Sequence, residues 1–86
     1  MSFDWDKFRA LVDETYQWPD FYEFKFIVKE ADKQPVLDIL SDCEIIEHPS
    51  KQGTYVSVTA RKLMKNTDEV IDIYLRMSPL KGVMSL

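Results

Sequence analysis

The sequence has little of the residues that specialised sites need: one cysteine, one histidine and two glycines in 86 residues. The lone Cys43 forms no intramolecular disulfide, which fits a reducing compartment. Cys43 and His48 together fall short of the four ligands of a structural zinc site, and a histidine-based catalytic triad would have to use His48. We therefore expect neither an enzyme nor a cofactor.

Long apolar runs are also missing. No stretch approaches the roughly 20 apolar residues of a membrane span. The N-terminal residues 1–6 are acidic and lack the apolar core of a secretory signal. These absences predict a cytoplasmic protein without a membrane association.

Positive charge is in deficit, with 11 basic against 15 acidic residues and a net charge of −4. A net negative chain disfavours general nucleic-acid binding and binding to anionic lipid, which both need a basic surface. The hydrophobic content of 45% and the aromatic content of 13% are those of a folded chain. A chain of this length makes one small domain.

Periodicity predicts a leading helix followed by the order β-α-β-β-α-β. Apolar residues recur at helical spacing in the expected helices and alternate in the expected strands. Asp4 is the expected cap of the first helix, Asp32 or Gln34 of the second, and Asn66, with Glu69 in a capping box, of the third. The third helix ends before Pro79. The other helices are expected at 4–16 and 32–42, and the strands at 21–29, 44–48, 54–62 and 83–86.

Short connections and right-handed crossovers turn this order into an α+β, ferredoxin-like βαββαβ sandwich. We expect a four-stranded antiparallel sheet with two helices on one face, formed by residues 21–86. Residues 1–17 are an N-terminal helical extension of the same domain. Trp5, Phe8, Leu11 and Val12 form its apolar stripe. That stripe needs a surface, and we expect it at a sheet edge or on the second face of the sheet.

Four segments carry a resemblance to a known family: 18–28, with Trp18-Pro19 before the first strand, 50–60, 69–74 and 82–86. Together they resemble the YbeD-like family of small bacterial proteins of unknown function, in the form with an extra N-terminal helix that is seen in Bacteroidetes-type bacteria. The resemblance implies a ferredoxin-like fold similar to the ACT regulatory domains of amino-acid metabolism. ACT domains commonly bind amino acids near the loop after the first strand, often with a glycine there. Here that loop, 29–32, has no glycine, which shifts the expectation toward a protein partner.

The turn at 50–53 joins two strands instead of entering a helix, and it lacks the second glycine and the Gly-Lys-Ser/Thr ending of a phosphate-binding P-loop. Gly53 suits the left-handed position of a hairpin turn. The turn is therefore interpreted as structural. Outside the turn, Cys43 is interpreted as a buried thiol and His48 as a structural or solvated side chain.

The open face of the sheet is the candidate site. Its expected members are outward-pointing residues of the first and third strands, together with Lys51 in the turn: Lys25, Ile27, Lys51, Tyr55, Ser57, Thr59 and Arg61. Lys25 and Arg61 could hold an anion or a partner's carboxylate. The alternative is a solvated face, or one that the N-terminal helix partly covers.

Three classes of function stay open at this point. We favour a non-catalytic regulatory module that binds a protein partner or a small metabolite, and homodimerisation through strand edges or the sheet is one form of it. A nucleic-acid module using Tyr55, Lys25, Arg61 and Lys51 is the second hypothesis. An enzyme is the third, and the least favoured.

Overall fold

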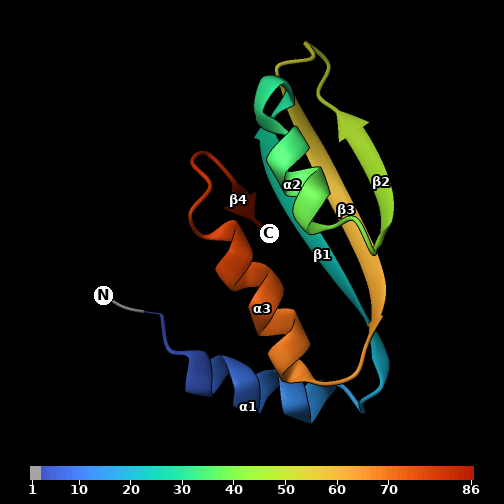
Figure 1. Cartoon of the computed structure of the whole chain (residues 1–86), viewed down its shortest axis with the longest axis vertical. Coiled ribbons are helices and arrows are strands. Elements are labelled where there is room, and N and C mark those ends of the chain that lie inside the picture. Colours follow the sequence, from blue (N-terminus) through green and yellow to red (C-terminus); the bar gives the residue numbers. More distant parts are fainter. Residues whose placement is uncertain (1–2) are drawn as a thin grey trace.

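The elements of the computed structural model, which describes residues 3–86, follow the predicted order. They are α1 (Trp5–Thr15), β1 (Asp20–Lys29), a short 3-10 helix η1 (Glu30–Asp32), α2 (Gln34–Ile39), β2 (Glu44–Pro49), β3 (Tyr55–Met64), α3 (Thr67–Met77) and β4 (Met84–Ser85). The sheet is antiparallel, in the order β2-β3-β1-β4, and α2 and α3 pack on one face of it (Figure 1). The ferredoxin-like fold is confirmed.

The core lies between the sheet and these two helices. Alternation along β1 sends Phe24, Phe26 and Val28 inward, opposite Ala60, Val58 and Val56 of β3. The two helices cover these strand residues. The covering side chains are Val36 of α2, Leu40 at its C-cap, and Val70, Ile73 and Met77 of α3. The predicted inward faces of both central strands are confirmed, and the stacked rings of β1 supply much of the buried area of a small core.

The helix starts follow the predicted caps at both long helices. Lys7 donates its backbone N–H to the Asp4 carboxylate (3.1 Å), and Glu69 donates its backbone N–H to the Asn66 side-chain oxygen (3.0 Å). The Glu69 carboxylate in turn accepts the backbone N–H of Lys65 (2.6 Å), the residue before the cap. Side chains thus satisfy backbone donors that an isolated helix leaves without partners.

The prediction of one helix over 32–42 was wrong. η1 comes first, α2 covers only Gln34–Ile39, and its N-cap, Lys33, makes no side-chain capping bond. The ring of Pro35 has no N–H and fits only the first turn, so the α-helix begins at Gln34 and not at Asp32. At the strand ends, β3 runs on to Met64 and β4 is limited to Met84–Ser85.

The leading helix α1 does not lie on the second face of the sheet. It packs against α3, where Phe8 and Trp5 meet the ring of Tyr74 at centroid distances of 5.7 and 6.5 Å (Figure 1). Leu11, expected in the apolar stripe, is 66% exposed. The other face of the sheet is therefore left bare by α1.

The hairpin turn has the predicted geometry. Gly53 has φ +73° and donates its N–H to the Ser50 carbonyl (2.9 Å). The Ser50 hydroxyl accepts the N–H of Tyr55 (3.2 Å). Gly53 therefore sets the turn between β2 and β3. No helix within residues 3–86 is long and apolar enough to cross a membrane.

Candidate functional site

The register of the sheet places six of the seven predicted site residues on the open face, in neighbouring positions. Lys25 lies opposite Thr59, and Ile27 lies opposite Ser57, on the two central strands. Tyr55 and Arg61 lie toward the two ends of β3 on the same face. Lys51 lies apart from them, in the exposed hairpin turn beyond Tyr55.

Large apolar side chains on this face were missed by the sequence reasoning. At one end Phe21, the first residue of the strand predicted at 21–29, faces Leu63, which lies beyond the predicted end of β3 at residue 62. Ile46 lies beside Thr59, and Met84 lies beside Ile27, so β2 and β4 add apolar groups on both sides of the central pair. Only the strand pairing reveals these neighbours, because the alternation of a single strand does not say what flanks it.

The exposed fractions of these side chains are high for their size. Of the nine large hydrophobic residues exposed within residues 3–86, six lie on the open face: Phe21 (47%), Ile46 (57%), Tyr55 (44%), Leu63 (49%), Met84 (61%) and Leu86 (65%). Leu86 belongs to this set because its N–H donates to the Lys25 carbonyl (2.9 Å), which places it opposite Lys25. The face thus combines apolar groups from all four strands with a few charges.

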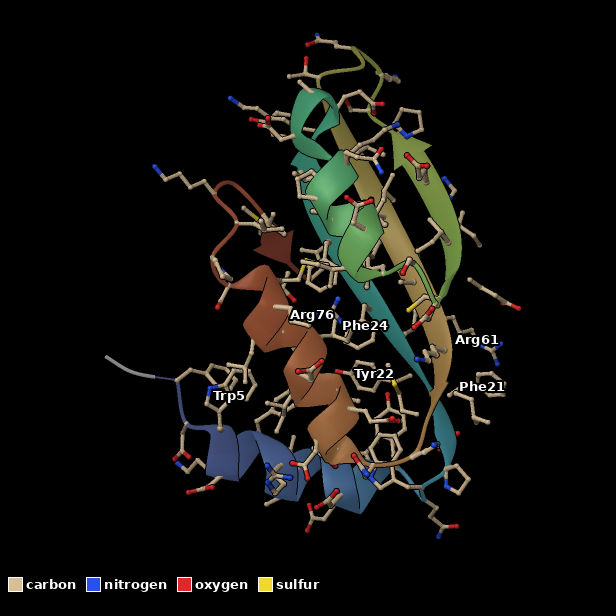
Figure 2. The ribbon with its side chains drawn as sticks, viewed as in Figure 1. Trp5, Phe21, Tyr22, Phe24, Arg61 and Arg76 are labelled. Carbon is tan, nitrogen blue, oxygen red and sulfur yellow. The ribbon has the colours of Figure 1, made fainter. Side chains whose placement is uncertain are left out.

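Arg61 is already engaged within the face. Its guanidinium carbon lies 3.8 Å from the centroid of the Phe21 ring, a cation–π contact between neighbouring strands (Figure 2). In register it lies between Glu23 of β1 and Glu44 of β2. This cation therefore faces carboxylates on both sides, which lowers its capacity to hold a phosphate backbone.

The two outward-pointing rings on β1 and β3, Phe21 and Tyr55, stand at opposite ends of the face. Phe21 pairs with Leu63, eight residues along β3 from Tyr55. At about 3.3 Å per residue the separation is roughly 26 Å. Adjacent bases of a single strand could not stack on both rings, as they do in sheet-based RNA-binding domains.

Cys43 and His48 do not form an activated pair. His48 lies on the open face opposite Ser57. Cys43 is half-buried at the end of the turn after α2, and burial raises the pKa of its thiol. A raised pKa moves the group away from the nucleophilic thiolate, so the structural interpretation of Cys43 is the one the geometry favours.

A mixed-charge cleft of about 370 Å³ lies on the helix side, between the end of α2, β3 and α3. Its ion pairs are Lys62 with Asp42 (3.9 Å) and Arg76 with Asp72 (3.8 Å). No group of three or more histidine, cysteine or acidic side chains in residues 3–86 is arranged to hold a metal ion. The acidic residues of the cleft thus act as partners of nearby cations and helix starts.

An aromatic hollow of about 380 Å³ lies where α1, α3 and β4 meet, lined by Phe3, Trp5, Phe8, Tyr74 and Ser85. Tyr74 is its central ring, and its hydroxyl lies 3.0 Å from that of Tyr22 on β1. Figure 2 shows Tyr22 and Phe24 pointing from β1 toward α3, with Trp5 on the other side of that helix. No local pattern in the sequence predicts this hollow, because its walls come from both ends of the chain.

The fold and these surfaces define a small ferredoxin-like α+β protein with a bare sheet face. The chain belongs to a family described as "Protein of unknown function (DUF493)", which matches residues 13–86. The match begins inside α1 and covers the whole βαββαβ unit. No curated protein and no solved structure matches the chain.

Proposed function

We propose that this protein is a non-catalytic regulatory module that binds another protein on the open face of its sheet. The observation that supports the proposal is the gathering of six of nine exposed large hydrophobic side chains on that face. Exposed apolar groups that cluster, with charges among them, are typical of protein interaction sites. The charged residues of the face, Glu23, Glu44, Lys25, Lys29 and Arg61, would fix the orientation of the partner.

A protein partner suits this face better than a small metabolite does. A metabolite site is concave and encloses most of its ligand, whereas this face is a sheet surface. Directly after the loop that follows β1, where ACT domains commonly bind amino acids, Lys33 pairs with Glu30 (2.5 Å) and Glu47 (3.0 Å). This lysine is thus occupied by its own neighbours.

A nucleic-acid partner has less support. Three features disfavour nucleic-acid binding: the separation of Phe21 from Tyr55, the carboxylates beside Arg61, and the net charge of −4. Retention of single-stranded RNA at low ionic strength, lost as salt is added, would favour the nucleic-acid module over our proposal.

We further infer that the chain is a YbeD-like, ACT-like member of its family and acts in the bacterial cytoplasm. The strand patterns of 21–28 and 55–60, and the single cysteine, support this finer assignment. A regulatory role fits a domain of this size, which would modulate a partner that it contacts.

The test compares two matched variants of the full chain in the native host. Ile46→Glu places a charge in the open face, and Leu75→Glu does the same at a residue of α3 that is 50% exposed and lies off that face. Tagged wild-type and variant proteins are cross-linked in cells and their neighbours quantified by mass spectrometry. Thermal unfolding checks that each variant is folded.

We expect a defined protein, or a second copy of this chain, to be enriched with the wild type and with Leu75→Glu and lost with Ile46→Glu. Sedimentation equilibrium separates the second copy from other partners. The proposal would be overturned if a partner were equally enriched with the wild type and both variants. It would also be overturned if no partner were enriched with any of the three proteins in its folded state.

A further inference from the structure

The charged side chains of the open face are segregated along its strands. Glu23 and Glu44 flank Arg61 in one row across the sheet, toward the end where β1 begins. Lys25 and Lys29 lie further along β1, on the same face. The face therefore has an acidic row near one end and lysines toward the other, with Arg61 set between the two glutamates.

These charges have no partners of their own. The ion pairs of residues 3–86 all lie elsewhere, and none of them includes Glu23, Lys25 or Lys29. All three side chains are exposed. Because nothing in this part of the chain neutralises them, they are available to charges on a second molecule.

A twofold axis that crosses the strands at Phe26 would place this pattern on its own complement. Phe26 pairs with Val58, and Glu23 and Lys29 lie three residues from Phe26 in opposite directions. If two sheets stack face to face about this axis, Glu23 of one copy lies over Lys29 of the other, and the symmetry forms the same pair a second time. Packed sheets lie about 10 Å apart, a gap that these two long side chains span together.

The same axis brings complementary groups together on β3. Arg61 and Tyr55 lie three residues from Val58 in opposite directions. Arg61 of one copy would therefore lie over the exposed Tyr55 ring of the other. This is a second cation–π contact of the kind that Arg61 already makes with Phe21.

We propose that the partner on the open face is a second copy of this chain, stacked face to face about this twofold axis. The inference rests on the function proposed above, and it adds which protein is bound and in which orientation. Stacking about an axis along the strands would instead gather the lysines of both copies at one end and the glutamates of both at the other. Such like-charge contacts are unfavourable, so the charge pattern favours the axis across the strands.

The dimer should be reversible. The net charge of −4 on each copy opposes association at long range, and one face of a small sheet is a small interface. We therefore expect the purified wild type to dimerise in the micromolar to millimolar range, as measured by sedimentation equilibrium of the full chain.

Reversal of one charge at a time tests the orientation. Glu23→Lys sets lysine against lysine in both symmetric pairs, and Lys29→Glu sets glutamate against glutamate. Each variant alone should dimerise about tenfold or more weakly than the wild type. An equimolar mixture of the two variants again has opposite charges in both pairs, so it should associate about as well as the wild type.

Two reversals on α1 are the matched controls. Glu14→Lys and Lys7→Glu change the net charge by the same amounts at exposed residues of a helix that does not lie on the open face. They should associate much as the wild type does, alone or mixed. Sedimentation is run at low ionic strength, because salt screens exposed pairs, and thermal unfolding checks that every variant is folded.

Three results would overturn the inference. The first is a mixture of the open-face variants that associates no better than either variant alone. The second is an equal weakening by the α1 controls, and the third is a wild type that stays monomeric at millimolar concentration. In each case the cross-linking test described above would still enrich a different protein if the open-face proposal is correct, so the two proposals fail separately.

Discussion

The hydroxyl pair of Tyr22 and Tyr74 is the polar contact that joins β1 to α3 beside the aromatic hollow. The two oxygens lie 3.0 Å apart in a partly buried position. Burial, and then the hydrogen bond to Tyr74, raise the pKa of the Tyr22 hydroxyl far above its ordinary range. The perturbation is a double-mutant cycle of Tyr22→Phe, Tyr74→Phe and both together.

Each single change leaves one partly buried hydroxyl without its partner, which costs about 1 kcal/mol of unfolding free energy. The double change removes both hydroxyls, so its cost should also be about 1 kcal/mol and not the sum of the two. The expected coupling is thus about 1 kcal/mol. For a chain of this size, each single change should shift the urea midpoint by about 1 M.

The assay is urea unfolding followed by circular dichroism and by the fluorescence of Trp5 and Trp18. Tyr55→Phe, on the open face and 44% exposed, is the control and should change nothing. If the effects of the two single substitutions on the free energy of unfolding simply added in the double variant, the reasoning would be refuted, because the hydroxyls would then not act as a pair.

Because the pKa of Tyr22 is raised in the folded state, the free energy of unfolding depends on pH in a defined direction. The unfolded state releases the Tyr22 proton first, near pH 10. The stability that this group contributes is therefore complete below about pH 10 and is lost as the pH rises above it. Tyr22→Phe should lose stability less steeply than the wild type in this alkaline range, and an identical slope would contradict the assignment.

Three further predictions concern single contacts. The Ser57 hydroxyl is buried without a hydrogen-bond partner in residues 3–86, so Ser57→Val should be more stable than the isosteric Ser57→Thr by about 1 kcal/mol in urea unfolding; equal stability would contradict this. Asp13 accepts hydrogen bonds from Thr67 and Trp18, which lower its pKa. Its contribution is complete above the unfolded pKa of about 3.9 and is lost as the pH falls through the lower folded value. Asp13→Asn should therefore lower the melting temperature at pH 7 and approach the wild type near the folded pKa, whereas a constant difference would exclude the mechanism. Gly53→Ala meets no atom within 4 Å but keeps φ +73°, so it should cost about 1 kcal/mol from backbone strain alone, and Gly53→Asn should cost less.

The order of elements and the inward faces of β1 and β3 could be read from the chain because they depend on local periodicity. The caps at Asp4 and Asn66 and the turn at Gly53 were likewise predicted, since each depends on residues a few positions apart. The start of α2 was missed. Both Asp32 and Gln34 offered an N-terminus, and only the folded chain uses Asp32 for η1 instead.

The candidate surfaces were predicted only in part, because they are made by pairing across the fold. Lys25, Thr59, Ile27 and Ser57 were expected to share a face, and they do. Part of the apolar character of this face comes from lateral neighbours on β2 and β4, Ile46 and Met84, and the register of these strands is not a local property. Leu11 shows the same limit, since helical spacing places a residue on a stripe but does not say what the stripe meets.

The sequence by itself determined the class of fold, the alternating core strands and the helix starts, because these depend on spacing, capping groups and a left-handed glycine. Only the tertiary structure decided that α1 packs on α3 and leaves the sheet bare. It also decided that β4 pairs with β1 at Phe26 and Ile27, which adds Met84 to the open face. Both outcomes depend on how segments from opposite ends of the chain share the surface of α3 and the edge of β1.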